Sequence, residues 1–339
     1  MKKLLFLLIA VVIFSSHDMY LKLDNYYLQP NAQARIQLFN GTFDKSDNVI
    51  TRDRMVDASL VGNGTRTKID TNQWSDQDKT TVLSFKTGAA GTWVAGVSTA
   101  PRNIEMTAAD FNGYLEHDGV LDMLEWRKNN NALEQDAVEK YSKHVKTIFQ
   151  VGDQLTGDWQ TQLNYPLEFI PLSNPYDLHP GHQLQLELLW QGQPLANQLV
   201  YVGSPAHSHD SEHGHSHEAG TDHDHSHDEG EDHHHALKQL RTDAQGMLTL
   251  NITDKGIWYL RTIYLTQSEE AGLTHESNWA TLSFEIGDGY HHGVAEDQHE
   301  HDHHHHEEEL TLGIPAYVYW IGSLVVFLGL FFWFNRKTS

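Results

Sequence analysis

Short segments in which apolar and polar residues alternate make up much of the chain, with turn residues between them. In the first third they include 34–39 before Asn40-Gly41, 81–85, and 91–97. Alternation with a period of two puts successive side chains on opposite faces of a strand. The pattern therefore predicts an N-terminal β domain over residues 17–106.

The pattern changes over residues 107–149, which lack proline and are dense in helix-forming residues. Apolar residues recur there at helical intervals: Leu121, Leu124, Val138, Tyr141 and Val145. We expect a helical segment made of two helices, with a break near 129–131. A helix lying on a membrane surface is the alternative, but the mixed charge of the segment favours packing against the sheets.

Strand patterns return over residues 150–290. Apolar or alternating runs separated by turn signals occupy 184–190, 198–202, 247–252, 256–266 and 279–286. Short strands at such intervals are typical of an immunoglobulin-like β-sandwich. The fold class expected for the chain is thus mainly β, with sandwich domains, an inserted helical segment and one C-terminal membrane helix.

The N-terminal residues 1–16 have the order of a secretory signal peptide. Lys2 and Lys3 precede an apolar run over 4–14, and two serines follow it. Cleavage after Ser15 or Ser16 fits this pattern, and the second cut would make His17 the mature N-terminus.

Near the other end, residues 314–334 form an uncharged apolar stretch long enough to cross a hydrocarbon core about 30 Å thick. Tyr317, Tyr319 and Trp320 lie near one of its ends and Trp333 near the other, and Arg336 and Lys337 follow it. Aromatic residues favour the interfaces and basic residues the cytoplasmic side. We predict a transmembrane helix over 314–334, a cytoplasmic tail over 335–339, and a body outside the cytoplasm.

The amino-acid composition limits the classes of ligand that the protein is expected to bind. The formal net charge is −23, so nucleic acid and anionic lipid are not expected to bind, whereas cations are. There is no cysteine, which excludes disulfides and thiolate metal sites. Imidazole and carboxylate remain as the strong ligands, and they suit Ni, Co, Zn and Cu(II) better than Cu(I).

Histidine is concentrated in two tracts, which hold 19 of the 25 histidines. The first is a loop over 207–235 that interrupts the second β domain, and the second lies in a His- and acid-rich juxtamembrane linker over 291–309. Repeated His-x-His pairs with nearby carboxylates can place two imidazoles on one ion. The predicted metal ligands are His207, His209, His213, His215, His217, His223, His225, His227, His233, His234, His235, His291, His292, His299, His301, His303, His304, His305 and His306.

Two other interpretations of the tracts are a purification tag and a pH sensor. A tag does not explain the interspersed acids or a position before a membrane helix. A sensor is possible chemically because imidazoles titrate near neutral pH. Metal binding is favoured over both, and acid should then release the metal because protons compete for the same nitrogens.

Six histidines lie outside the tracts, and His17 is the sharpest metal candidate among them. As a mature N-terminus it would offer an α-amine and an imidazole together, beside Asp18. Pairing of His17 within the fold is the equally weighted alternative. His117 and His144 are expected on solvated helix faces, and His179 and His182 in a turn. No nucleophile–base pair, phosphate loop or HExxH motif is found, so we do not expect an enzyme.

Several segments carry a family resemblance: LKLDNYYLQPN after His17-Asp18, EKYSKHVKTIF at 139–149, the run 165–195, the run 241–265, and ESNWATLSFEI at 276–286. They resemble bacterial envelope proteins described as the nickel or cobalt uptake substrate-specific transmembrane region, largely a domain of unknown function. The resemblance implies a periplasmic β-sandwich anchored in the inner membrane, acting beside a metal permease. It also implies that His17 matters for metal. The histidine tracts themselves are similar to those of zinc transporters.

The leading hypothesis is a membrane-anchored protein that captures Ni, Co or Zn and delivers it to an uptake system. One alternative is an envelope protein that buffers or detoxifies metal. Another is a structural or adhesive β-sandwich protein that metal or pH regulates.

Overall fold

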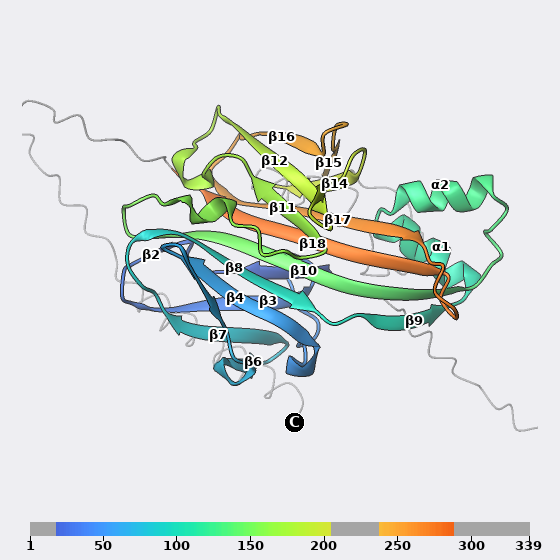
Figure 1. The fold of residues 1–339 in the computed structure, drawn as a ribbon, viewed down its shortest axis with the longest axis horizontal. Helices are drawn as coiled ribbons and strands as arrows, with labels where there is room; N and C mark the ends of the chain where they lie inside the picture. Colours follow the sequence, from blue (N-terminus) through green and yellow to red (C-terminus); the bar gives the residue numbers. More distant parts are fainter. Residues whose placement is uncertain (1–17, 205–236, 288–339) are drawn as a thin grey trace, which may run out of the picture. The chain divides into compact units, whose positions relative to one another are not determined.

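The computed structural model describes residues 18–204 and 237–287, which form a mainly β structure with two α-helices (Figure 1). The predicted fold class is confirmed to that extent. In chain order the elements are β1 (Asp18–Lys22), β2 (Tyr27–Leu28), β3 (Gln33–Gly41), η1 (Arg52–Arg54), β4 (Met55–Gly62), β5 (Thr65–Lys68), η2 (Thr71–Gln73), β6 (Trp74–Gln77), β7 (Thr80–Lys86), β8 (Gly91–Thr99), β9 (Arg102–Met106), α1 (Ala108–His117), α2 (Leu121–Asn129), β10 (Ala137–Val151), η3 (Gly157–Gln160), β11 (Leu167–Pro171), η4 (Pro175–Asp177), β12 (Gln183–Trp190), β13 (Gln193–Pro194), β14 (Leu199–Gly203), β15 (Lys238–Arg241), β16 (Met247–Asn251), β17 (Gly256–Gln267) and β18 (His275–Ile286).

A central sheet of ten strands runs through the described residues, in the order β15-β14-β17-β18-β10-β8-β4-β5, with β2 and β9 also paired to β10. β10 and β18 lie parallel within it, with Glu139 opposite His275 and Thr147 opposite Ser283. β18 also pairs with β17, and the two form a long antiparallel hairpin (Figure 1). Strands from both predicted β domains therefore share one sheet, which is joined through β10.

Two smaller sheets cover the central sheet. One has the order β1-β3-β7-β6, and the other contains β11, β12, β13 and β16. Ser283 and Thr281 of β18 donate to the backbone of β1, at Leu21 and Met19. Lys146, which is paired in register with Leu282, instead donates to the β11 side. Because neighbouring residues of a strand face opposite sides, the two small sheets lie on opposite faces.

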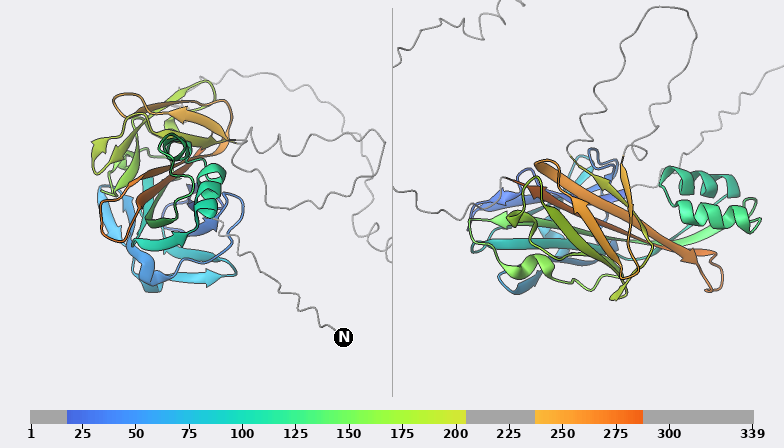
Figure 2. Two further views of the ribbon diagram at one scale, coloured as in Figure 1. Left: turned by 90° about the vertical axis from the view of Figure 1, so that its right-hand side faces the viewer. Right: turned by 90° about the horizontal axis from the view of Figure 1, so that it is seen from above.

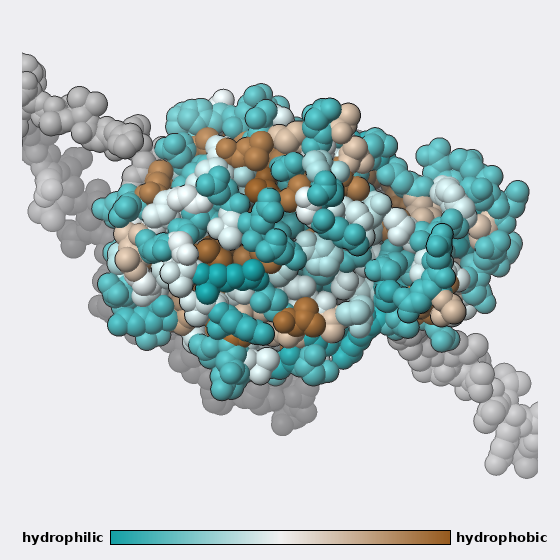
Figure 3. All heavy atoms as spheres, in the orientation of Figure 1, coloured by the Kyte–Doolittle hydropathy of each residue, from teal (hydrophilic) through white to brown (hydrophobic). Residues whose placement is uncertain are grey.

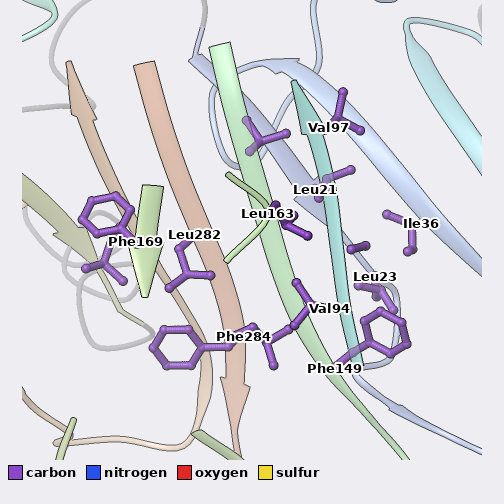
Figure 4. Close-up of a cluster of buried hydrophobic side chains, with 14 of the residues drawn as sticks. Leu21, Leu23, Ile36, Val94, Val97, Phe149, Leu163, Phe169, Leu282 and Phe284 are labelled. Carbon is purple, nitrogen blue, oxygen red and sulfur yellow. The ribbon is translucent and has the colours of Figure 1, made fainter. Parts of the chain in front are cut away.

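The main hydrophobic core follows the same two-sided arrangement (Figure 4). Phe169, Leu282 and Phe284 lie together on one side of β10 and β18, and Leu21 and Ile36 lie on the other. Each of these side chains is almost fully buried. Burying a residue of this size contributes about 1.5–3 kcal/mol, so both layers stabilise the central strands.

The α1–α2 pair packs on the central sheet at the β9 end of the structure (Figure 2). Its buried residues Phe111, Leu115 and Leu124 contact Ile263 of β17 and Trp279 of β18. Thr107 caps α1, since its hydroxyl accepts a hydrogen bond from the Asp110 amide. This second apolar cluster fixes the end of α1 against β17.

The prediction of helix over the whole of 107–149 is wrong for its second half. Residues Ala137–Val151 form β10, and the break between the helices lies at 118–120 rather than 129–131. β10 is paired on both sides and covered on both faces, so its apolar residues need not alternate. A strand of this kind carries no clear period that would separate it from a helix.

Exposed large apolar side chains are few among the described residues: Val56, Leu121, Trp126 and Leu172. The face shown in Figure 3 is mostly hydrophilic, with separate small apolar patches. Within the same residues no helix is long and apolar enough to span a membrane. The predicted signal peptide at 1–16 and transmembrane helix at 314–334 lie outside the described residues, as do the linker 291–309 and the tail 335–339.

Candidate functional site

The predicted metal ligands all fall outside the described residues. His17 immediately precedes the first described residue, and the two tracts fall in 205–236 and 288–339. Across 18–204 and 237–287, no three His, Asp or Glu side chains converge as a metal site. The structure is therefore informative about the surroundings of these ligands, beginning with Asp18.

Asp18, at the start of β1, is buried in an ion pair. Its side chain is 3% exposed, and its Oδ2 atom lies 2.8 Å from Nε of Arg261, which is 1% exposed. The Tyr20 hydroxyl donates to the same Oδ2 atom at 3.1 Å. Two ions removed from water are tolerated only when they are closely paired, so this contact fixes the beginning of β1.

Arg261 connects Asp18 to the end of α1. Its two terminal nitrogens donate to the backbone carbonyl of Asp118, at 3.1 and 2.6 Å. The guanidinium also lies over the Tyr201 ring, 4.9 Å from its centre. Burial is the largest single influence on the pKa of Arg261 and lowers it, but Asp18, Tyr20, Asp118 and Tyr201 together outweigh burial, so the pKa is raised. One cation thus holds β1, β14 and α1 together.

His117, which contacts the buried Asp118, is the exposed member of this cluster. Asp118 is the C-cap of α1, and its Oδ1 atom lies 3.1 Å from Nδ1 of His117. The His117 side chain is 50% exposed, whereas that of Asp118 is 2% exposed. The hydrogen bond to Asp118 raises the pKa of His117, and burial raises the pKa of Asp118.

Gly119 allows the chain to turn out of α1 at this point. Its φ angle is +72°, and a Cβ atom there would lie 2.0 Å from the Tyr201 hydroxyl oxygen. That hydroxyl donates to the Gly119 carbonyl at 2.9 Å. Both the backbone conformation and the close approach therefore require glycine.

Glu139 and Lys143 extend the cluster along β10. The Glu139 carboxylate accepts hydrogen bonds from Ser277 and from Tyr114, the latter at 3.3 Å. Burial raises the pKa of Glu139 to about 7 and lowers that of Lys143 to about 8. The negative charge of Asp18 acts in the opposite direction and raises the pKa of Lys143. The cluster thus contains three carboxyl groups and two cations beneath the surface.

A cavity of about 200 Å³ opens beside the cluster. Asp118 and Arg261 line it together with Gln198 and Tyr201. The cluster is therefore reachable from a hollow between α2 and the β14–β17 strands.

The first histidine tract begins and ends on strands next to this cluster. β14 and β15, which flank it, pair antiparallel, with Val202 opposite Lys238. The two described strands on either side of the tract are therefore neighbours in the central sheet. Tyr201 of β14 is also paired with Arg261 of β17. Residue 204, where the described chain stops before the tract, is thus three positions from a residue that contacts Arg261.

Comparison with known proteins identifies the family. The chain matches, over residues 14–266, the family described as Domain of unknown function (DUF4198). This protein belongs to the DUF4198 family. Among curated proteins none matches it.

Solved structures give only distant matches to this DUF4198 chain. One is Escherichia coli alpha-2-macroglobulin activated by porcine elastase, with 10% identity and a TM-score of 0.20 over 80% of this chain and 20% of that one. Another is the Yersinia pseudotuberculosis adhesin InvE, with 12% identity and a TM-score of 0.18 over 79% of this chain and 58% of that one. A third is the D00-D0 domain of Intimin, with 9% identity and a TM-score of 0.16 over 80% and 100%. The chain thus spans a fifth and somewhat over half of the first two structures.

His117 is the exposed imidazole of the described cluster. An imidazole that donates from Nδ1 to a carboxylate keeps the Nε2 lone pair for a metal ion, and the carboxylate makes that nitrogen a better ligand. The Nδ1 atom of His117 lies 3.1 Å from Oδ1 of Asp118, and the ring is half in solvent. The pair alone supplies one imidazole ligand, so any further ligands must come from elsewhere.

Sequence reasoning missed most of this cluster. His117 was expected on a solvated face, and its bond to a buried Asp118 was not foreseen. The prediction for His144 is wrong, because β10 buries it between Ser98 and Asn278, at 2.9 Å from each. One signal was available: Arg261 interrupts an otherwise apolar strand, which indicates a buried charge that needs a partner.

Proposed function

We propose that this DUF4198 protein captures a divalent transition-metal ion, Ni, Co or Zn, outside the cytoplasm and delivers it to a membrane metal permease. The two histidine tracts collect ions, and a site formed by His17 and His117 selects one. The protein performs no chemical turnover in this role. Anchoring by the predicted helix 314–334 keeps the body beside the permease, at the periplasmic face of the inner membrane.

The observation that carries the proposal is the placement of Asp18 and Asp118 on one guanidinium. Asp18 Oδ2 and the Asp118 carbonyl both lie within 3.1 Å of Arg261 nitrogens. His17 is bonded covalently to Asp18, and His117 to Asp118. Consecutive Cα atoms are about 3.8 Å apart, so each histidine is the direct chain neighbour of a residue that Arg261 contacts.

The donor set supports nickel, cobalt or zinc rather than calcium or magnesium. A mature His17 would offer its α-amine and imidazole, and His117 would add a second imidazole. Nitrogen ligands of this kind suit late transition metals, whereas Mg²⁺ and Ca²⁺ prefer oxygen. The charge of Asp18 is compensated by Arg261, whereas the Asp118 carboxylate lies next to His117 and favours a cation there.

Collection of ions by the first tract is supported by the strand that precedes it, because β14 carries Tyr201, whose ring contacts Arg261 of the cluster. Imidazole ligands of this kind, without a site of fixed shape, would bind metals in order of intrinsic affinity. A structured site beside them would then determine which ion is retained. We also propose the immunoglobulin-like description for each sandwich, which the short antiparallel strands in paired layers support.

Elemental analysis of the purified ectodomain, together with N-terminal sequencing, tests the division of roles. We expect His117→Ala to lower the affinity for one tightly bound ion by at least about tenfold, because the ion loses a ligand. Deleting 207–235 and 291–306 should instead reduce the number of ions bound and keep the tight one. Glu116→Ala removes an exposed side chain from the same turn and should change neither quantity.

Growth under metal limitation separates delivery from buffering. A deletion strain should grow poorly when metal is scarce if the protein delivers metal, and should be sensitive to excess metal if it buffers. Unchanged metal stoichiometry and unchanged metal-limited growth after loss of both tracts would contradict the proposal. Loss of surface attachment with a normal metal phenotype would favour the adhesive alternative.

A further inference from the structure

His179 and His182 occupy the ends of a tight turn between η4 and β12. The His182 amide donates to the His179 carbonyl at 3.1 Å, and Gly181 has a φ angle of +99°. Proline at the second position and glycine at the third are the signature of a type II turn. The predicted turn is confirmed, and its ends lie close together because of this geometry.

The turn is also fixed to the neighbouring strand. The Gly181 amide donates to the Ile252 carbonyl at 2.8 Å, and the Ile252 amide donates to the His182 carbonyl at 3.0 Å. Beyond it, the Gln183 amide group donates to the Asn251 side chain at 2.9 Å. The backbone beneath both histidines is therefore held by the sheet rather than by the side chains.

The two imidazole rings meet above this turn. Their centres are 3.7 Å apart, and their planes are inclined by 39°. His179 is exposed and His182 is half-buried, so solvent reaches the pair. Two nitrogens bonded to one ion at about 2.0–2.1 Å require ring centres about 5 Å apart, so the two rings would have to separate by about 1 Å to share an ion.

The hydrogen bond of His179 prepares its ring for a metal ion. Its Nδ1 atom lies 2.9 Å from the Pro180 carbonyl oxygen, which can only accept. Nδ1 must therefore carry the proton, which leaves the Nε2 lone pair available. A backbone carbonyl on the second ring nitrogen is a usual partner for metal-binding histidine.

We propose that His179 and His182 form a separate metal-binding site, in which both imidazoles hold one divalent transition-metal ion such as Ni²⁺ or Cu²⁺. Within the described ranges no acid or third histidine joins them. The remaining coordination positions belong to water. Such an ion is exchangeable, unlike one in a closed four-ligand site.

This site is distinct from the one at Asp18. β12 and β16 belong to the small sheet on the face opposite β1, so the turn and Arg261 lie in different layers. The inference does not depend on the proposed function. A protein that failed to deliver metal could still bind it here, and the converse also holds.

Footprinting of the full chain with diethyl pyrocarbonate, read by peptide mass spectrometry, tests the site because it reports each histidine separately. With Ni²⁺ at ten times its dissociation constant, mass action predicts about a tenfold drop in modification of both His179 and His182. Mg²⁺ should give no protection, since it avoids imidazole.

The decisive variant is His182→Gln. If one ion bridges both rings, this change removes the Ni²⁺ protection of His179. Gln183→Ala alters the same turn without touching a ligand and should leave the protection intact. His117→Ala should also leave it intact, which separates this site from the proposed selective site.

Two outcomes would overturn the inference. One is unchanged modification of His179 and His182 in the wild-type chain when Ni²⁺ is added. The other is full protection of His179 in the His182→Gln variant, which would mean that each histidine binds independently or that another segment shields it.

Discussion

Replacing Arg261 by methionine tests the buried ion pair that organises the candidate site. Methionine keeps part of the apolar volume of the side chain and removes its charge. Asp18 would then remain 3% exposed with the Tyr20 hydroxyl bond but without its cation. The two hydrogen bonds to the Asp118 carbonyl would also disappear.

The expected cost is large for a single substitution. Breaking a buried pair by removing one partner lowers the free energy of unfolding by about 3–5 kcal/mol, because an uncompensated charge is left inside. Asp18→Asn retains the shape of the side chain but leaves the buried Arg261 charge uncompensated, so it should also cost about 3–5 kcal/mol. The double variant should lose less than the sum of the two, since each single change removes the same interaction.

Equilibrium urea unfolding at neutral pH measures these differences, and Arg241→Met is the matched control. Arg241 pairs with Asp122 near the same cavity, but the two side chains are 39% and 54% exposed. Exposed pairs contribute at most about 1 kcal/mol. Equal losses for Arg261→Met and Arg241→Met, or strict additivity in the double variant, would refute the assignment.

Three further predictions concern pH, backbone and metal release. Burial lowers the pKa of His144 to about 4. As the pH falls, this imidazole therefore takes up a proton in the unfolded chain before it does so in the folded protein. The free energy of unfolding should fall by roughly 3 kcal/mol between about pH 6.5 and pH 4. His144→Gln should reduce that slope in urea titrations. Gly119→Ala should destabilise the protein by about 2 kcal/mol more than Gly64→Ala in the same assay, because both positions have positive φ but only Gly119 would clash with Tyr201. Metal bound to the tract 207–235 should be released below about pH 6.5, as measured by equilibrium dialysis, because protons compete for imidazole.

Each of these outcomes can fail independently. An unchanged pH slope in the His144→Gln variant would mean that other groups dominate acid unfolding. Equal costs at Gly119 and Gly64 would show that Tyr201 can move aside. Metal retained at pH 5 would indicate carboxylate rather than imidazole ligation in the tract.

Strands bounded by turn residues could be predicted from local sequence. The run 184–190 became β12, and 256–266 became most of β17, because glycine and proline mark their ends and their composition suits a pleated surface. The His179 turn was also predicted, since Pro-Gly at its centre specifies the backbone angles locally. Local chemistry determined these elements, and the tertiary structure did not change them.

β10 shows where that approach fails. Its polar residues, including Lys143, His144 and Lys146, are interspersed with apolar ones in a way that predicts an amphipathic helix. In the structure each of them is buried with a polar partner, and for Lys146 that partner is Glu168, at 2.8 Å. Hydrogen bonding to other strands, rather than intrinsic propensity, decides the conformation of such a segment.

The sequence by itself determined the mainly β class, several turns, and the positions of the two histidine tracts and of the two apolar terminal segments. Only the tertiary structure decided which charges are buried together. Asp18, Asp118 and Arg261 come from distant parts of the chain and meet because β17 crosses beside both β1 and the end of α1. Ion pairs between such distant residues depend on long-range packing, and long-range packing produces no local periodicity or motif in the sequence.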